Sequence, residues 1–306
     1  MPLPFRLIYH EGYNLDLGEH VFPAQKYRGL RDRLLHTGFV AEGDFIEPQA
    51  ASDEDILLVH SRDWVRKLRN GALTPQEILL LEIPYSQRMV EAFWLAAGGT
   101  ILAARLALSA GMAFHIGGGF HHAFPDHGEG FCAINDIAVA IRRVQRDGAI
   151  RRAMVVDCDV HHGNGTAAIF AGDDSVFTLS IHQLHNYPSV KPLSDLDIHL
   201  PDGAGDQQYL DRLRNGLAAA LSMFRPDLMI YVAGADPFRQ DRLGGLALTF
   251  DGLRARDRLV LESAHARRIP VAIVLAGGYA ENTEDTIGIH AATAEVAKTV
   301  CGAGGS

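Results

Sequence analysis

The sequence predicts an α/β protein built on a mostly parallel β-sheet with helices on both faces. The first observation is that short apolar segments alternate with longer helical segments through the second half of the chain. The second is composition: 47% of the 306 residues are hydrophobic and 21% are charged, as in proteins with a large buried core. No linker or composition break divides the chain, so we expect a single domain over residues 1–306.

The first third of the chain predicts one strand and several helices. Residues 5–9 are apolar and short, as in a first strand. Ser52 and Thr74 are residue types that cap helices, and acidic residues follow each of them within one turn. Gly71 ends the helix that lies between these two starts. Further helices are expected at 24–36 and 86–110.

From residue 112 onward the pattern of strand, loop and helix repeats. The predicted strands are 112–116, 152–158, 175–181, 227–233 and 271–275, with a shorter one at 197–200. The predicted helices are 134–147, 206–223, 252–267 and 284–298. Helical connections of this length join parallel strands, so this half of the chain predicts a parallel sheet.

Composition also limits the classes of function. The formal net charge is −9 and the sequence has no basic block, which disfavours tight binding to nucleic acid or to an acidic membrane. Cys132, Cys158 and Cys301 lie far apart and predict no disulfide framework, as in a reducing compartment. Charge or glycine interrupts the apolar stretches, and the N-terminus lacks the pattern of a signal peptide. We therefore expect a cytoplasmic protein without a membrane span.

Glycine-rich or polar segments follow four of the predicted strands. In an open α/β sheet the ligand site lies beyond the carboxyl ends of the strands. The four segments are therefore candidates for one shared site. They are residues 117–122, 157–165, 233–236 and 276–279.

The second of these segments has the residue pattern of a metal site. Asp157, Asp159 and His161 alternate, so their side chains lie on one side of an extended segment, and Cys158 points to the opposite, buried side. Two adjacent carboxylates repel each other unless a cation or a proton lies between them. With Asp236 as a third ligand, Asp159 and His161 predict a catalytic site with an open position. Zinc suits these ligands, and Fe(II), Mn and Co(II) remain alternatives.

Two further segments supply groups for acid–base chemistry. His121 and His122 follow three glycines, and adjacent imidazoles provide a proton acceptor and a proton donor near neutral pH. Tyr279 follows Gly277 and Gly278, where its phenol can hydrogen-bond a developing oxyanion. We expect structural roles for His60, His115, His182, His185 and His199.

Five segments in this order resemble the histone deacetylase family of zinc-dependent deacylases. They are Gly-Gly-Gly-Phe-His-His at 117–122, Gly-Glu-Gly-Phe-Cys at 128–132, Asp-Cys-Asp-Val-His-His-Gly-Asn-Gly at 157–165, Asp-Arg-Leu-Gly-Gly at 241–245 and Gly-Gly-Tyr at 277–279. The resemblance implies the arginase/deacetylase fold, a single domain with about eight strands. Within the family it is nearest to the class IV branch, judging by the short chain, Asn164, residues 186–188 and residues 233–236.

The resemblance assigns a role to each candidate residue. Zn²⁺ would be held by Asp159, His161 and Asp236. The implied catalytic residues are His121, oriented by Asp157, His122, oriented by Asn164, and Tyr279, which would polarise the scissile carbonyl. The implied substrate-binding residues are Phe131, which would line a narrow acyl-lysine tunnel, and Gly130, whose carbonyl would face the substrate amide. A structural K⁺ ion would bind near Asp157, Ser180 and the backbone of Asp159, His161 and Ile181.

The chain also departs from parts of the family pattern. Asn164 stands where class I enzymes have an aspartate, which should bias His122 less strongly toward its charged form. Pro237, Phe238 and the loop 182–196 are less standard, and they leave the acyl-group preference open.

The sequence thus predicts a zinc-dependent hydrolase of an amide bond, with the substrate undecided. An acetyl-lysine or fatty acyl-lysine protein, an acetylated polyamine and another small amide all need the same chemistry. A binuclear manganese ureohydrolase is a second hypothesis, but no second Asp-x-Asp pair follows residues 227–233. An acyl-lysine reader without catalysis is a third, which His121, His122 and Tyr279 disfavour. The sequence does not decide the oligomeric state, and a homo-oligomer is one alternative.

Overall fold

One β-sheet organises the computed structural model of the protein, which describes residues 3–302. Within these residues the sheet has eight strands in the order β2-β1-β3-β8-β7-β4-β5-β6, and every neighbouring pair is parallel. The strands are β1 (Arg6–Ile8), β2 (Phe45–Ile46), β3 (Met112–His115), β4 (Ala153–Asp157), β5 (Val176–Gln183), β6 (Leu196–Leu200), β7 (Leu228–Val232) and β8 (Val271–Val274). The predicted α/β class is confirmed.

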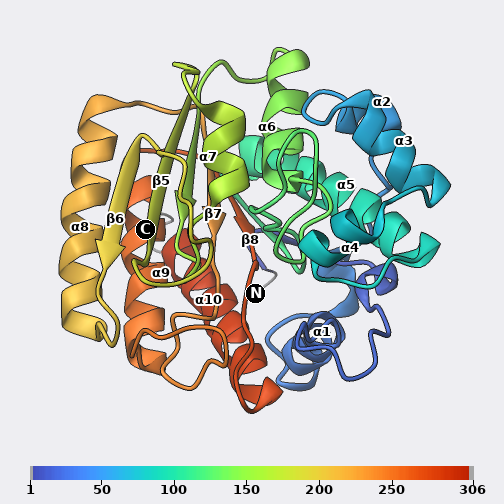
Figure 1. Ribbon diagram of the computed structural model, residues 1–306. Coiled ribbons are helices and arrows are strands. Elements are labelled where there is room, and N and C mark those ends of the chain that lie inside the picture. The colour runs from blue at the N-terminus through green and yellow to red at the C-terminus, as the bar shows by residue number, and fades with distance from the viewer. Residues whose placement is uncertain (1–2, 303–306) are drawn as a thin grey trace.

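Helices lie on both faces of this sheet. They are α1 (Lys26–His36), α2 (Asp53–Ile56), α3 (Arg62–Asn70), α4 (Pro75–Leu81), α5 (Gln87–Ala110), α6 (Asp136–Arg146), α7 (Asn164–Phe170), α8 (Asp206–Met223), α9 (Phe250–His265) and α10 (Thr283–Gly302). Helices α8, α9, α10 and α1 contact one another in series, and α5 packs against α6. Figure 1 shows the orange and red helices α9 and α10 on one side of the strands, away from α5 and α6.

Alternate residues of the central strand β4 explain the two helical layers. Met154 and Val156 belong to one hydrophobic core together with Leu213 of α8. Val155 belongs to a second core together with Ile141 of α6. Since neighbouring side chains of a strand point to opposite faces, a strand that is apolar at every position must be covered twice.

The predicted helix starts and stops agree with the structure. The hydroxyl of Ser52 accepts a hydrogen bond from the backbone of Asp55, and Thr74 caps α4 through Glu77 in the same way. Gly71 ends α3 with a φ of 65°, a conformation that glycine adopts at low cost. The predicted strands and the other predicted helices lie within a few residues of the observed ones.

One strand and one α-helix among the described residues were not predicted, and neither were the short 3-10 helices Glu11–Tyr13 and Glu42–Asp44. Strand β2 has only two residues, Phe45 and Ile46, and pairs with β1 at the edge of the sheet, so it has no periodicity to detect. Helix α7 begins at Asn164 and Gly165, residue types that indicate a loop. Gly165 is required there by close packing, because a Cβ atom would lie 2.3 Å from the backbone oxygen of Ala123.

Glycine and charge interrupt the apolar stretch of helix α5, as predicted, at Gly98, Gly99 and Arg105. This helix is long and apolar enough for a span by length and composition. The glycines lower the mean hydropathy of the helix only slightly, because alanine and other apolar residues surround them. However, 67% of its most apolar window is buried inside the protein, as is typical of a core helix.

The strand order brings the four candidate segments together. Strands β3, β8, β7 and β4 are consecutive neighbours in the sheet. Because all of them are parallel, their carboxyl ends lie along one edge, and the segment that follows each strand lies beside the next. The sheet therefore places the four segments at one site.

Candidate metal centre and catalytic pocket

Three buried side chains converge beyond β4 and β7. His161 Nδ1 lies 3.0 Å from Asp159 Oδ1 and 3.3 Å from Asp236 Oδ2. Ligand atoms of all three residues lie within 4.8 Å of one another, and the three side chains are at least 90% buried. The structure therefore brings together the three predicted metal ligands.

The chemistry of this cluster fits a divalent cation. The buried Oδ2 of Asp236 has no hydrogen-bond partner among the described residues. Burial and the neighbouring carboxylate of Asp159 raise the pKa of Asp236 to about 7. A Cβ atom on residue 277 would lie 2.0 Å from this Oδ2, so Gly277 leaves the room that the carboxylate occupies. An unpaired buried carboxylate oxygen is costly, and a cation would satisfy it.

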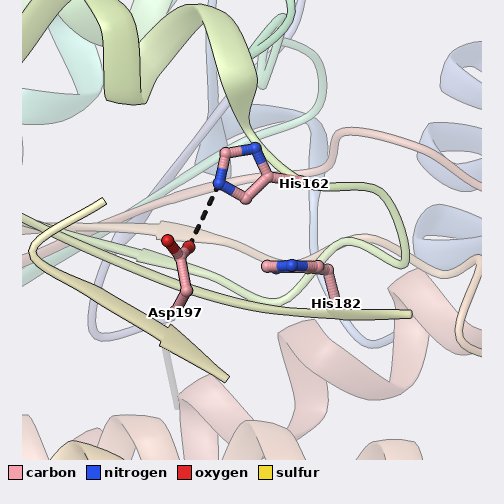
Figure 2. Close-up of side chains that lie close together, drawn as sticks. All are labelled: His162, His182 and Asp197. Carbon is pink, nitrogen blue, oxygen red and sulfur yellow. Dashed lines mark hydrogen bonds and ion pairs between the residues drawn. The ribbon is translucent and has the colours of Figure 1, made fainter. Parts of the chain in front are cut away.

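A second cluster of metal-binding residue types has different hydrogen bonding. It consists of His162, His182 and Asp197 (Figure 2). His162 Nε2 lies 3.1 Å from Asp197 Oδ1, and Figure 2 shows its other ring nitrogen pointing away from the cluster. His182 Nδ1 lies 2.9 Å from Ser180 Oγ, and its Nε2 lies 2.8 Å from His199 Nδ1. The atoms that face one another are therefore already paired.

The two predicted catalytic histidines are buried side by side. His121 Nδ1 lies 2.7 Å from Asp157 Oδ2, and because a carboxylate only accepts, the imidazole donates. His122 Nδ1 lies 2.6 Å from Asn164 Oδ1. The two Nε2 atoms lie 3.1 Å apart. The predicted orienting partners, Asp157 and Asn164, are thus in hydrogen-bond contact with the predicted histidines.

The environment separates the proton affinities of this pair. Burial would lower the pKa of His121, but the carboxylates of Asp157 and Asp159 outweigh it and raise this pKa to about 9. Burial and the neighbouring His121 lower the pKa of His122 well below its usual value. One imidazole therefore favours the charged form, while the other is neutral and able to accept a proton.

Tyr279 and Phe131 line the pocket above the metal centre. The pocket has a volume of about 410 Å³, and its wall is formed by both aromatic rings, by Gly130 and by the imidazoles of His122 and His161. Its remaining lining residues are His20, Glu82, Asn186, Tyr187 and Leu243. Burial raises the pKa of Tyr279 well above its usual value, so the phenol keeps its proton and can donate a hydrogen bond.

The residues predicted to bind potassium lie near Asp157, on strands β4 and β5 and in the segment that follows β4. In the register of β4 and β5, Asp157 pairs with Ser180, and Ile181 follows Ser180 in β5. Asp157 Oδ1 accepts a hydrogen bond of 3.1 Å from the backbone of Asp159. The residues are close together, and the presence of potassium stays a prediction.

Sequence reasoning assigned no role to several residues that support this site. Lys26 is fully buried, donates a hydrogen bond of 2.7 Å to the Ala276 carbonyl and lies 5.7 Å from the Tyr279 ring. Asp241 accepts a hydrogen bond of 2.6 Å from the backbone of Tyr279. Asp241 begins one of the motifs quoted above, whereas a lysine in a helix indicates a solvent-exposed face. No sequence pattern distinguishes Lys26 from a surface residue.

Known proteins resemble this chain over most of its length. The family model described as "Histone deacetylase domain" matches residues 20–295. An uncharacterized protein of Picosynechococcus sp. is 43% identical over 297 residues, which cover 97% of this chain and 99% of that protein. Histone deacetylase 2 of Arabidopsis thaliana is 32% identical over 294 residues, which cover 92% of this chain and 76% of that protein.

Solved structures share the fold. The crystal structure of an HDAC homolog from Aquifex aeolicus matches with a TM-score of 0.81 and 24% identity, and it covers 96% of this chain and 84% of its own. The HDA15 HD domain matches with a TM-score of 0.80 and 24% identity, over 97% of this chain and 88% of its own. The predicted arginase/deacetylase fold is confirmed, and with the match over residues 20–295 the chain belongs to the histone deacetylase family.

Proposed function

We propose that this hydrolase removes an acyl group from the side-chain amine of acyl-lysine in proteins or peptides, with one divalent metal ion, Zn²⁺, as cofactor. The supporting observation is that a three-ligand cluster and a pair of histidines with opposite pKa shifts lie beside one pocket, whose wall includes His122, His161 and the protonated Tyr279. Asp159, His161 and Asp236 would hold the ion. When bound, it would lower the pKa of water and polarise the acyl carbonyl.

The histidines divide the proton transfers between them. His122 lines the pocket with a neutral imidazole, so it accepts the proton of the attacking water. His121 keeps its positive charge beside Asp157 and stabilises the negative charge that develops. The water oxygen bonds to the acyl carbon, the carbon–nitrogen bond breaks, and His122 returns the proton to the leaving amine. The products are a carboxylate and a free amine.

Tyr279 and the pocket wall act on the substrate itself. The phenol of Tyr279 donates a hydrogen bond to the oxyanion that forms from the acyl carbonyl. The ring of Phe131 and the backbone at Gly130 form part of the wall, where they would contact the methylene chain of lysine. A pocket lined by aromatic rings and by the imidazoles of His122 and His161 suits a long aliphatic amine whose reacting amide lies beside the imidazoles.

A small acylated amine, such as an acetylpolyamine, is the second candidate substrate. Glu82 lines the same pocket and is an exposed residue. A carboxylate there would attract the distal ammonium group of a polyamine. The overall charge of −9 also favours a cationic small molecule over a nucleosome-bound substrate.

A substrate panel tests the proposal. Zinc-replete protein is incubated with lysine peptides that carry acyl groups from acetyl to myristoyl and with acetylated polyamines, with and without chelator. Chelator-sensitive release of amine from peptides supports acyl-lysine hydrolysis. If only polyamines react, and Glu82→Gln raises their KM, the second candidate replaces the first. No release from any substrate by protein with bound zinc would contradict both.

A structural potassium ion is part of the same proposal. Asp157 and Ser180, paired across β4 and β5, supply oxygen atoms of the kind that hard cations prefer. We expect stability to rise when potassium replaces a large organic cation in the buffer. Equal melting temperatures in the two buffers would contradict this site.

A further inference from the structure

A carboxylate with no assigned role lies behind the histidine pair. Glu129 Oε1 accepts a hydrogen bond of 2.8 Å from Asn164 Nδ2 and one of 2.6 Å from the hydroxyl of Tyr187. Asn164 Oδ1 lies 2.6 Å from His122 Nδ1. Glu129 is therefore connected to the catalytic imidazole through a single amide group.

Three separate segments of the chain form this connection. Glu129 lies in the loop between β3 and α6, Asn164 begins α7, and Tyr187 lies in the loop between β5 and β6. The Glu129 side chain is 15% exposed. A carboxylate buried to this degree is costly unless it is hydrogen-bonded, and here two donors reach the same oxygen.

The chemistry of the carboxylate determines how the amide of Asn164 is oriented. A carboxylate only accepts hydrogen bonds, so Asn164 must turn its NH₂ group toward Glu129. The amide oxygen then faces His122, and Nδ1 of His122 must carry a proton to donate to it. The lone pair of His122 is left on Nε2, which lies 3.1 Å from Nε2 of His121. Of the two ring nitrogens of His122, this is the one that can accept a proton; a charged His121 donates to it in the structure, so water reaches the lone pair when that contact opens.

Glu129 is suited to impose this orientation because it is ionised. Burial would raise its pKa, but hydrogen bonds from His127, Tyr187 and Asn164 outweigh burial and lower the pKa. Burial and the charge of Glu129 raise the pKa of Tyr187, so Tyr187 remains a donor. The charge also polarises the amide, which strengthens the acceptor that His122 meets.

We propose that Glu129 is a positioning residue that acts through Asn164 to keep the proton of His122 on Nδ1 and the reactive lone pair on Nε2. The inference rests on the proposed amide hydrolysis. Without a carboxylate at this position, the amide of Asn164 is free to rotate and to present NH₂ to His122. The opposite tautomer would then form, with a protonated Nε2 that cannot accept a proton from water.

Substitutions at residue 129 test the acceptor. Glu129→Leu should lower kcat about 10- to 100-fold and leave KM within about twofold, since the loss is one of base catalysis and not of substrate binding. Glu129→Gln keeps an oxygen that accepts from Asn164, so it should recover most of the lost turnover. Metal content, measured by mass spectrometry, should equal that of the unsubstituted protein in both variants.

An exchange of the two groups tests the connection between them. Asn164→Asp places a second carboxylate next to Glu129, and repulsion should reduce kcat. In the double variant Glu129→Gln with Asn164→Asp, the amide donates to the carboxylate, and the carboxylate accepts from His122. Its kcat should exceed that of Asn164→Asp alone by about fivefold or more, because directly contacting residues are coupled. A double variant no better than the product of the single effects would overturn the proposal.

Nitrogen-15 spectra of labelled histidine report the tautomer without any substrate. His122, identified by loss of its signal in His122→Gln, should carry its proton on Nδ1 in the unsubstituted protein and lose that preference in Glu129→Leu. An unchanged tautomer would overturn the proposal, because a merely structural role would lower only stability. If the tautomer shifts but no substrate is hydrolysed by any form, the positioning role stands and the proposed function fails.

Discussion

Two buried clusters of histidine and aspartate differ in the hydrogen bonding of their side chains. They are adjacent in the sequence, because one contains His161 and the other His162. His161 faces Asp236, whose Oδ2 has no hydrogen-bond partner among the described residues. His162 faces Asp197 with an Nε2 that is already paired, and the nearby His182 has partners at both ring nitrogens. In the first cluster an oxygen that faces the other ligands has no partner, whereas in the second, which we call the closed network, the atoms that face one another are paired and the unpartnered Nδ1 of His162 points away.

The difference follows from the cost of burying charge. An unpaired buried carboxylate oxygen is unfavourable, and a divalent cation or a proton would relieve it. Asp197 has two donors instead, since the backbone of Ser194 also donates to it at 3.0 Å. Residue type alone does not identify a metal site. A metal site is identified instead by converging ligand atoms that lack hydrogen-bond partners when no ion is bound.

Removing one carboxylate charge from each cluster should show most clearly which cluster binds the metal. Asp236→Asn should lower kcat/KM by at least about 100-fold and abolish stoichiometric metal, because a catalytic site then loses one of three ligands. The matched control, Asp197→Asn, should keep both metal and turnover. Metal analysis and peptide hydrolysis check the pair. Loss of metal in Asp197→Asn alone would place the ion in the second cluster.

A substitution beside the first cluster separates ion binding from catalysis. Tyr279→Phe should lower kcat about 100- to 1,000-fold, because the oxyanion loses a donor while the ligands stay intact. Metal content and the melting temperature should be unchanged. Turnover equal to that of the unsubstituted protein would remove the phenol from the mechanism.

Much of the first cluster could be predicted because its residues follow strands. Asp159 and His161 follow a buried apolar segment directly, and Asp236 follows another, so the topology of a parallel sheet brings them together. The supporting residues could not be predicted in this way. Lys26 comes from a helix, and Tyr187 comes from a loop whose path the sequence does not determine.

The same reasoning explains which parts of the fold were predicted. Long apolar segments such as those of β4 and α5 have a pattern that local sequence determines. Strand β2 is too short to show alternation, and α7 begins with Asn164 and Gly165 because the backbone of Ala123 packs against it. Tertiary contacts, and not local preference, decide those two elements.

The closed network should contribute to stability and not to activity. Asp197→Asn leaves His162 without its carboxylate acceptor and weakens the bond to Ser194, which should lower the free energy of unfolding by about 1–3 kcal/mol. Urea unfolding measures this change. The control Asp174→Asn is at an exposed residue and should shift the same quantity by no more than about 0.5 kcal/mol. Equal stabilities of the two variants would contradict a structural role for the network.

The smallest expected effect is a pH dependence that originates in the closed network. Burial and the neighbouring His162 lower the pKa of His182 from 6.5 to about 3, so this imidazole is neutral in the folded protein. The unfolded chain binds a proton there near pH 6.5 and the folded chain does not. The contribution of His182 to stability is therefore complete above pH 6.5 and is lost as the pH falls toward 3.

Between pH 8 and pH 6, this group alone should lower the free energy of unfolding by about 0.8 kcal/mol. His182→Gln should reduce the pH dependence by that amount, whereas His185→Gln, at a side chain that is 71% exposed, should leave it unchanged. His161 has the opposite shift, because the carboxylates of Asp159 and Asp236 outweigh burial and raise its pKa to about 10. The proposed metal cluster thus favours a proton on His161 when no metal is present, whereas His182 in the closed network excludes one. Equal pH dependence of the His182→Gln variant and the unsubstituted protein would show that the network accepts a proton, and the distinction between the two clusters would fail.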